Sequence, residues 1–213
     1  MPKGPTKRRP ETVARLLEAA LDAFAERGVH GVTIEELCER AGFTRGAFYS
    51  NFRSKDELLW ALFDAYAERA VTRAGALLTA MDEAADPISA LIDASRLDDP
   101  EERRWYLVTT EINLYAMRDP DVARALAAHE DRLREKIAAL LAVAFERAGV
   151  RPAVDLHQLA RLLVAIREGG QAQSYVQPER YPPGDLERTF LPLILEAVTA
   201  GKRGAGDGGA REG

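Results

Sequence analysis

Apolar residues recur at intervals of three or four positions along most of the chain, which is the period of an α-helix with one buried face. After residue 53 this pattern predicts helices over residues 54–84, 87–96, 100–118, 120–148, 155–176 and 185–200. No segment alternates apolar and polar residues as a half-buried strand does. Together with three helices before residue 54, the sequence predicts an all-α protein of about nine helices.

Two of the N-terminal helices have clear start and stop signals. The first is predicted over residues 11–27 and ends before Gly28. The apolar positions of its buried face are Val13, Leu16, Leu17, Ala20 and Phe24. The second begins at Thr33, whose hydroxyl can accept a hydrogen bond from a helix N–H while Glu36 reaches back to the cap, the arrangement called a capping box. Gly42 allows the chain to turn where this helix ends.

A third short helix is predicted over residues 45–52, with Thr44 as its N-cap. Its apolar side consists of Ala47, Phe48 and Phe52. Ser54 followed by Glu57 repeats the capping-box pattern, so a long helix begins directly afterwards. Two short helices around a glycine turn indicate a helix-turn-helix, whose second helix lies in the major groove of DNA.

The segment from Thr12 to Leu62 resembles the TetR family of bacterial transcriptional repressors. The resemblance rests on A-F-A-E-R-G at the end of the first helix and on T-I-E-E-L-C-E-R-A-G-F-T-R-G-A-F-Y-S-N-F-R-S-K after it. It implies an N-terminal three-helix domain that binds DNA, followed by a larger helical domain for ligand binding and dimerisation. The chain is therefore expected to be a homodimeric repressor that binds a palindromic operator in double-stranded DNA and is released by a small-molecule effector.

By this resemblance, Thr33, Lys55 and the hydroxyl of Tyr49 are expected to hold phosphates. Thr44 is expected at the start of the recognition helix, and Arg45, Gly46 and Ala47 are expected to face base edges. Asn51 stands where the family often has His or another aromatic residue, so two roles stay open for it: a phosphate contact or bidentate pairing with adenine. With Ser50 on the polar side of the helix, the candidate DNA contacts are Thr33, Thr44, Arg45, Gly46, Ala47, Tyr49, Ser50, Asn51 and Lys55.

The charge is unevenly divided along the chain. The 213 residues carry a net charge of -5, which taken alone argues against nucleic acid. Residues 1–55, however, hold ten Lys or Arg and seven Asp or Glu, a net charge of +3, whereas residues 56–213 have a net charge of -8. Because phosphate repels an acidic surface, this division favours an orientation with only the N-terminal end toward DNA.

The ends of the chain differ from its middle in composition. The basic N-terminal tail is either an arm that reaches DNA or a solvated terminus, and the Gly-rich C-terminal end has little to bury. With neither a signal peptide nor a membrane-spanning run in the sequence, the expected location is cytoplasmic. The predicted organisation is a flexible basic tail, a helix-turn-helix domain, a regulatory and dimerisation domain and a disordered tail, over residues 1–10, 11–55, 56–200 and 201–213.

The last two predicted helices carry apolar stripes. Such stripes are usually part of an intramolecular core, but the resemblance implies that the last two helices of each subunit form a four-helix dimer interface. The candidate interface residues are Leu159, Leu163, Ile166, Phe190, Leu193, Ile194 and Ala197.

Aromatic and polar residues in the middle of the chain are candidates for an effector pocket, because a few polar groups among aromatic ones are typical of ligand sites. The candidate pocket residues are Trp105, Thr109, Ile112, Tyr115, Phe145 and Gln171. The alternative is that the aromatic residues only fill the core. Gly169 and Gly170 are unfavourable within a helix, so close packing or a cavity wall is expected there.

The sequence gives no sign of an enzyme, a metal site or a cofactor. None of the three His residues has a Glu three positions before it, as the ligands of a di-iron bundle do, and no Gly-x-Ser-x-Gly motif occurs. Two alternatives to a regulator remain. One is a helical interaction module that keeps the helix-turn-helix only as structure, and the other is an all-α ligand-binding protein without operator control.

Overall fold

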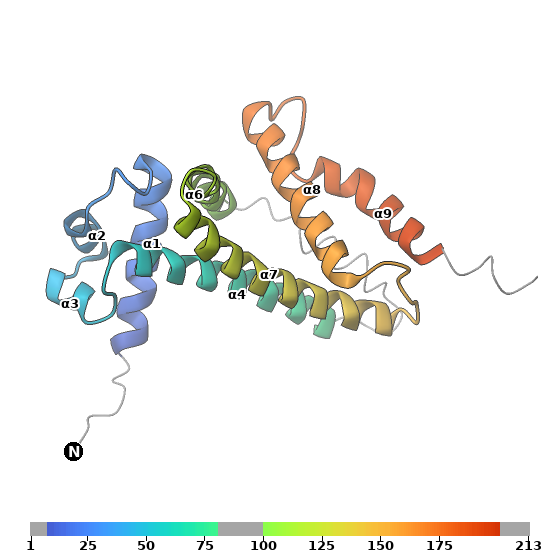
Figure 1. The fold of residues 1–213 in the computed structure, drawn as a ribbon, viewed down its shortest axis with the longest axis horizontal. Coiled ribbons are helices and arrows are strands. Elements are labelled where there is room, and N and C mark those ends of the chain that lie inside the picture. The colour runs from blue at the N-terminus through green and yellow to red at the C-terminus, as the bar shows by residue number, and fades with distance from the viewer. Residues whose placement is uncertain (1–7, 81–99, 201–213) are drawn as a thin grey trace, which may run out of the picture. The chain divides into compact units, whose positions relative to one another are not determined.

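The computed structural model describes residues 8–80 and 100–200, and all regular structure in these ranges is α-helical (Figure 1). The helices are α1 Arg8–Arg27, α2 Ile34–Ala41, α3 Arg45–Tyr49, α4 Lys55–Ala80, α6 Pro100–Ala116, α7 Pro120–Arg147, α8 Leu156–Val176 and α9 Asp185–Ala200. The predicted all-α class is confirmed. The helix expected over residues 87–96 and the tail over 201–213 lie outside the described residues.

Most helix ends agree with the sequence pattern to within a few residues, and two differ in an informative way. α1 begins at Arg8, so residues 8–10, which the sequence places in the flexible tail, are helical. α3 ends at Tyr49, three residues before the predicted end. No helix in the described ranges is long and apolar enough to span a bilayer.

The described residues form two compact units. The N-terminal unit holds residues 8–69 and 100–130, and the C-terminal unit holds residues 70–80 and 131–200. The helix-turn-helix therefore does not form a unit that ends at residue 55, because α6 and parts of α4 and α7 belong to it.

The core of the N-terminal unit explains this division. Phe24 of α1, Leu37 of α2 and Phe48 of α3 are almost completely buried in one cluster. The same core also takes side chains from α4, α6 and α7, namely Leu58, Leu59, Leu62, Phe63, Val108, Ile112 and Leu126.

The C-terminal unit has its own core. Phe145 of α7 packs with Leu159 of α8 and with Leu191 of α9. Asp155 caps α8, since its carboxylate accepts the N–H groups of His157 and Gln158, each at 3.0 Å.

Candidate nucleic-acid interface

The turn between α2 and α3 forms as its sequence predicts (Figure 1). The hydroxyl of Thr33 accepts from the N–H of Glu36 at 3.2 Å and begins α2. Gly42, with φ of 70°, ends α2, and its N–H donates to the carbonyl of Glu39 at 3.0 Å. The hydroxyl of Thr44 then begins α3 by accepting from the N–H of Ala47 at 3.2 Å. These three signals fix the course of the chain between the two short helices.

The capping box at Thr33 is only half formed, which corrects the sequence prediction. The carboxylate of Glu36 does not return to the cap but accepts from Arg27 at 2.9 Å and from Arg40 at 3.2 Å. Hydrogen bonds between ionised groups are stronger than those to a neutral backbone N–H, so the carboxylate of Glu36 binds the two guanidinium groups instead of the cap. At the start of α4, the hydroxyl of Ser54 accepts from the N–H of Glu57 at 3.1 Å, and the carboxylate of Glu57 accepts from the N–H of Arg53, the residue before the cap, at 2.6 Å.

The end of α3 is set by two polar side chains. The hydroxyl of Ser50 and the amide nitrogen of Asn51 both donate to the carbonyl oxygen of Ala47, each at 2.8 Å. Side chains that satisfy backbone carbonyls compete with continuation of a helix. Phe48 and Phe52 lie 5.8 Å apart between ring centroids and anchor the segment in the core, so their predicted apolar role is confirmed.

The outward side of α3 is polar and open to solvent. The exposed residues among the candidate DNA contacts are Thr33, Thr44, Arg45, Gly46, Tyr49 and Ser50, whereas Ala47, Asn51 and Lys55 are half-buried. Arg45 donates to Glu35 of α2 at 2.7 Å, and its guanidinium carbon lies 5.8 Å from the centroid of the Tyr49 ring. A hydrogen bond with Tyr49, followed by the charge of Glu35, raises the pKa of Arg45 above its ordinary value. Arg45 therefore stays charged.

The side chain of Asn51 forms hydrogen bonds within its own chain in this structure. Besides its bond to Ala47, its amide nitrogen donates to the hydroxyl of Ser50 at 3.2 Å. Its carbonyl oxygen is buried without a hydrogen-bond partner. Both roles that the sequence left open need a donor from this amide, so either one requires a change of these bonds. A DNA contact by Asn51 stays a prediction.

Lys55 has an intramolecular role that the sequence did not reveal. Its ammonium donates to the carbonyl oxygen of Val29 at 2.7 Å and to that of Val32 at 2.8 Å. Both carbonyls belong to the connection between α1 and α2. An ammonium group has three N–H donors, so these two bonds leave one for a phosphate.

The same connection is held from α6. Both carboxylate oxygens of Glu111 accept from the N–H of Val29, at 3.0 and 2.9 Å. The approach depends on Gly28, because a Cβ atom there would lie 2.9 Å from one of these oxygens, and its φ of 76° disfavours any other residue. The ring of Tyr115 lies 4.8 Å from that of His30. No local pattern predicts these contacts, since Glu111 and Val29 are 82 positions apart.

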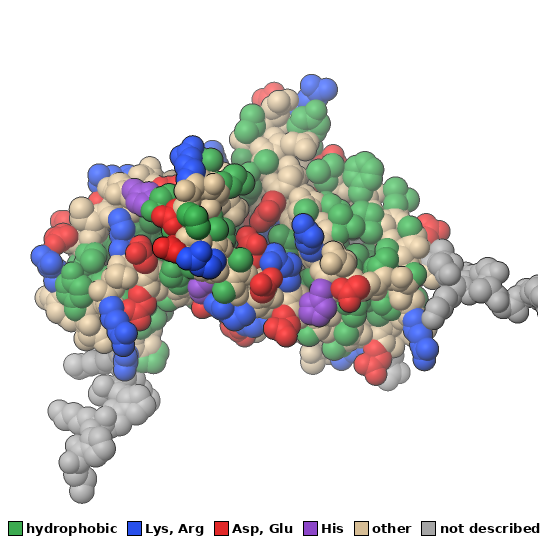
Figure 2. Space-filling model, in the orientation of Figure 1, with side chains coloured by type: hydrophobic (Ala, Val, Ile, Leu, Met, Phe, Trp, Pro, Cys, Tyr) green, Lys and Arg blue, Asp and Glu red, His purple; other side chains and the backbone are tan. Residues whose placement is uncertain are grey.

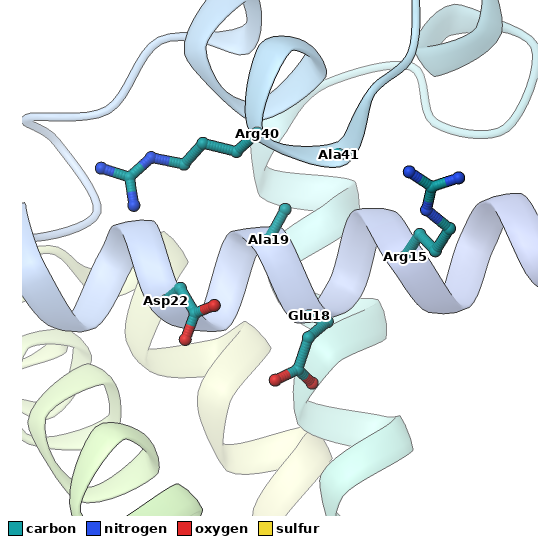
Figure 3. Close-up of a pocket in the computed structure, with 6 residues that line it drawn as sticks. All are labelled: Arg15, Glu18, Ala19, Asp22, Arg40 and Ala41. Atoms are coloured by element: carbon teal, nitrogen blue, oxygen red, sulfur yellow. The ribbon is translucent and has the colours of Figure 1, made fainter.

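A groove of about 330 Å³ lies between α1 and α2 (Figure 3). It is lined by Arg15, Glu18, Ala19, Asp22, Arg40 and Ala41. Its carboxylates are already paired, because Arg104 of α6 bonds to both Glu18 and Asp22. Arg40 bonds to Glu26 at 2.7 Å, and this bond raises the pKa of Arg40 and lowers that of Glu26. The groove is thus a set of internal ion pairs rather than a prepared ligand site.

The six candidate pocket residues fall into both units. In the N-terminal unit, Trp105 stacks on Tyr66 with centroids 4.3 Å apart, and Ile112 is buried in the core. The hydroxyl of Thr109 donates to the carbonyl of Trp105 at 3.1 Å, and Tyr115 is partly exposed. Phe145 fills the core of the C-terminal unit. Gln171 of α8 lies in the same unit but is not part of that core. Packing thus accounts for Trp105, Ile112 and Phe145, and the effector pocket stays a prediction.

The candidate interface residues divide between two faces. Leu159 is buried, and Leu163, Ile166 and Ile194 pack against the same C-terminal core. On the other side of α9, Phe190 and Leu193 are 48% and 58% exposed, and Ala197 is exposed too. Figure 2 shows hydrophobic side chains gathered over α8 and α9. Leu162 of α8, which is not among the candidate interface residues, is also exposed.

Comparison with known proteins agrees with this architecture. The family model for bacterial regulatory proteins of the TetR family matches residues 16–62, and the model described as BetI-type transcriptional repressor, C-terminal, matches residues 84–196. The chain is 29% identical over 158 residues to the transcriptional repressor AcnR of Corynebacterium efficiens. The aligned segment covers 72% of this chain and 77% of AcnR. The transcriptional regulator TtgR of Pseudomonas putida is 48% identical over 58 residues, which are 27% of this chain and 28% of TtgR.

A crystal structure described as a TetR-family transcriptional regulator from Rhodococcus sp. superposes with a TM-score of 0.74 at 20% identity, covering 89% of this chain and 99% of that one. This likeness shows the fold. The chain belongs to the TetR family, as the two family models together show. It is a DNA-binding transcription regulator, and its known relatives are regulators rather than enzymes.

Proposed function

We propose that this regulator is a repressor which binds a palindromic operator as a homodimer through the outward side of α3. The observation that supports it best is the exposure of Arg45, Gly46 and Tyr49 side by side, while Phe48 anchors the same helix in the core. An exposed guanidinium at the start of a recognition helix is suited to the two acceptors that guanine presents in the major groove. We further propose that the chain has no catalytic activity.

Gly46 adds an independent argument for a close partner at α3. Glycine weakens a helix, so its presence needs a reason. Packing inside the protein supplies none, because an added Cβ atom would meet only the hydroxyl oxygen of Thr44, at an ordinary distance of 3.7 Å. A smooth surface at Gly46 lets the helix backbone approach base edges closely. The phosphates on either side would be held by Thr33, Tyr49 and the remaining N–H of Lys55.

Gly169, like Gly46, is a helix glycine that packing inside the protein does not explain, and it supports dimerisation through α8 and α9. A Cβ atom at Gly169 would meet nothing within 4 Å, whereas one at Gly170 would lie 3.2 Å from Glu187. Only Gly170 is therefore explained by packing of α8 against α9. Gly169 shares a stripe on α8 with Leu162 and Ala165, at spacings that place all three on one side. A helix of the second subunit could approach closely there.

A small-molecule effector is proposed to bind to the part of the chain after residue 55 and to weaken DNA binding. A hundredfold loss of operator affinity requires a coupling free energy of about 2.7 kcal/mol between the two sites. The effector can act only if it binds the DNA-free arrangement more tightly. The acidic character of residues 56–213 supports a role for this part of the chain other than DNA contact.

Selection of bound sequences from a pool of random DNA duplexes tests the proposal. We expect the wild type to enrich one sequence with two inverted half-sites, since a symmetric dimer presents two copies of α3. Recovery of unrelated duplexes without a common sequence would contradict operator recognition. Enrichment of a single half-site without its inverted copy would contradict binding as a symmetric dimer.

A further inference from the structure

An acidic residue of α2 bonds directly to the arginine proposed to face base edges. Glu35 lies in the first turn of α2, and its Oε1 accepts from a terminal nitrogen of Arg45 at 2.7 Å. We propose that Glu35 is a specificity-determining residue, which orients the guanidinium of Arg45 and opposes its binding to phosphates. This inference rests on the proposed function of α3.

The geometry leaves Arg45 able to bind a base while it is paired. A guanidinium group presents five N–H donors in a rigid plane, and the bond to Glu35 uses one end of it. The ring of Tyr49 lies beside the same group, with 5.8 Å between the ring centroid and the guanidinium carbon. Held by an acidic and an aromatic neighbour, the guanidinium samples fewer directions than a free arginine. The donors not used by Glu35 can pair with the two acceptors of guanine.

The carboxylate of Glu35 also changes the balance between base and phosphate contacts. Arginine binds any duplex through phosphates, and this attraction carries no sequence information. Glu35 repels phosphates and compensates the positive charge of Arg45 through the ion pair, so it weakens the phosphate contact that all sequences share. Guanine is neutral and offers its acceptors in a fixed arrangement, so Glu35 repels it less than it repels a phosphate. The predicted result is weaker non-specific binding and a larger preference for the operator.

The pair is exposed, which suits a contact that must adjust when DNA binds. The side chains of Arg45 and Glu35 are 60% and 57% exposed. Exposed ion pairs add little to folding stability, so stability is a poor explanation for this one. The neighbouring carboxylates of α2 have other surroundings. Glu36 pairs with Arg27 and Arg40, whereas Glu39 is exposed and forms no ion pair within the described part of the chain.

Glu39 therefore provides a matched control. Glu35→Gln and Glu39→Gln remove the same charge from the same helix, but only the first removes a partner of Arg45. Affinities are measured by fluorescence anisotropy at several salt concentrations, for the duplex that the wild type selects from a random pool and for a scrambled duplex of the same composition. Circular dichroism verifies that each variant keeps its helix content.

We expect Glu35→Gln to bind the scrambled duplex more tightly than Glu39→Gln does, and to show a steeper salt dependence by about one released counterion. The ratio of the two affinities, selected over scrambled, should fall about tenfold for Glu35→Gln and stay near the wild-type value for Glu39→Gln. Equal ratios for the two variants would overturn the role of Glu35.

A second pair of variants shows whether Glu35 acts through Arg45. In the background of Arg45→Ala, adding Glu35→Gln should leave the ratio unchanged. A further fall would mean that Glu35 acts on DNA by itself, which overturns the inference. Failure of the proposed function has a different signature, because the wild type itself would then bind the selected and scrambled duplexes alike.

Discussion

The ammonium of Lys55 donates to the carbonyl oxygen of Val29 at 2.7 Å, while the N–H of the same residue, Val29, donates to Glu111 of α6. One peptide segment between α1 and α2 is thus held from α4 and from α6. Because Lys55 is also a candidate phosphate contact, the position of its charge depends on this segment. The N-terminal unit therefore extends well beyond the three helices of the DNA-binding motif.

Replacement of Lys55 by Met should lower both stability and DNA affinity. The carbonyl oxygens of Val29 and Val32 lose a charged donor in a half-buried place, which should cost about 1–3 kcal/mol in free energy of unfolding. DNA affinity should fall equally for all sequences, since phosphates carry no sequence information. Urea unfolding and anisotropy measure the two effects. Arg53→Met removes a nearby exposed charge and should leave the unfolding free energy unchanged. Equal stabilities for the two variants would refute the structural role of Lys55.

Gly28→Ala should destabilise the N-terminal unit by more than backbone strain alone. A residue other than glycine at positive φ costs about 1–3 kcal/mol, and the new methyl group would also press on Glu111. Gly149→Ala is the control, because Gly149 has a similar φ of 65° and open space around its missing Cβ atom. Thermal unfolding should show the larger loss for Gly28→Ala. If the two losses are equal, the contact with Glu111 contributes nothing.

Two substitutions on the outer faces of α8 and α9 should separate the subunits. Leu193→Asp places a charge among exposed apolar residues, and Gly169→Leu fills the open space on α8. Each should give monomers in sedimentation at a concentration where the wild type is dimeric, with unchanged helix content by circular dichroism. Operator affinity should fall at the same time, because each subunit then binds one half-site alone. Dimers in both variants would place the interface elsewhere.

Local chemistry made the helix-turn-helix predictable from the sequence. Thr33, Gly42 and Thr44 act on backbone groups within four positions of themselves, so their roles can be recognised from sequence spacing. Which of several possible hydrogen-bond partners a side chain binds was harder to predict. Glu36 has the spacing of a capping box, yet Arg27, nine positions away, binds its carboxylate instead.

Contacts between distant segments were not accessible to sequence analysis. The bond between Glu111 and Val29 and the membership of α6 in the N-terminal unit depend on tertiary packing. The apolar stripes of α8 and α9 were recognised, but periodicity could not tell which apolar residues face inward. Leu159 and Phe190 both belong to such stripes, and only Phe190 is exposed.

Arg45, on the exposed side of α3, is proposed to read a base. The most direct measurement compares wild type with Arg45→Ala on the selected duplex and on a duplex with one base pair changed in each half-site, by anisotropy at fixed salt. The same selection is first repeated with Arg45→Ala. The base pair to change is the one that the wild type prefers and that Arg45→Ala does not. We expect the affinity of the wild type to be about tenfold to a hundredfold lower for the changed duplex, whereas Arg45→Ala should bind both duplexes alike. A selection by Arg45→Ala that keeps every base preference of the wild type would contradict this proposal.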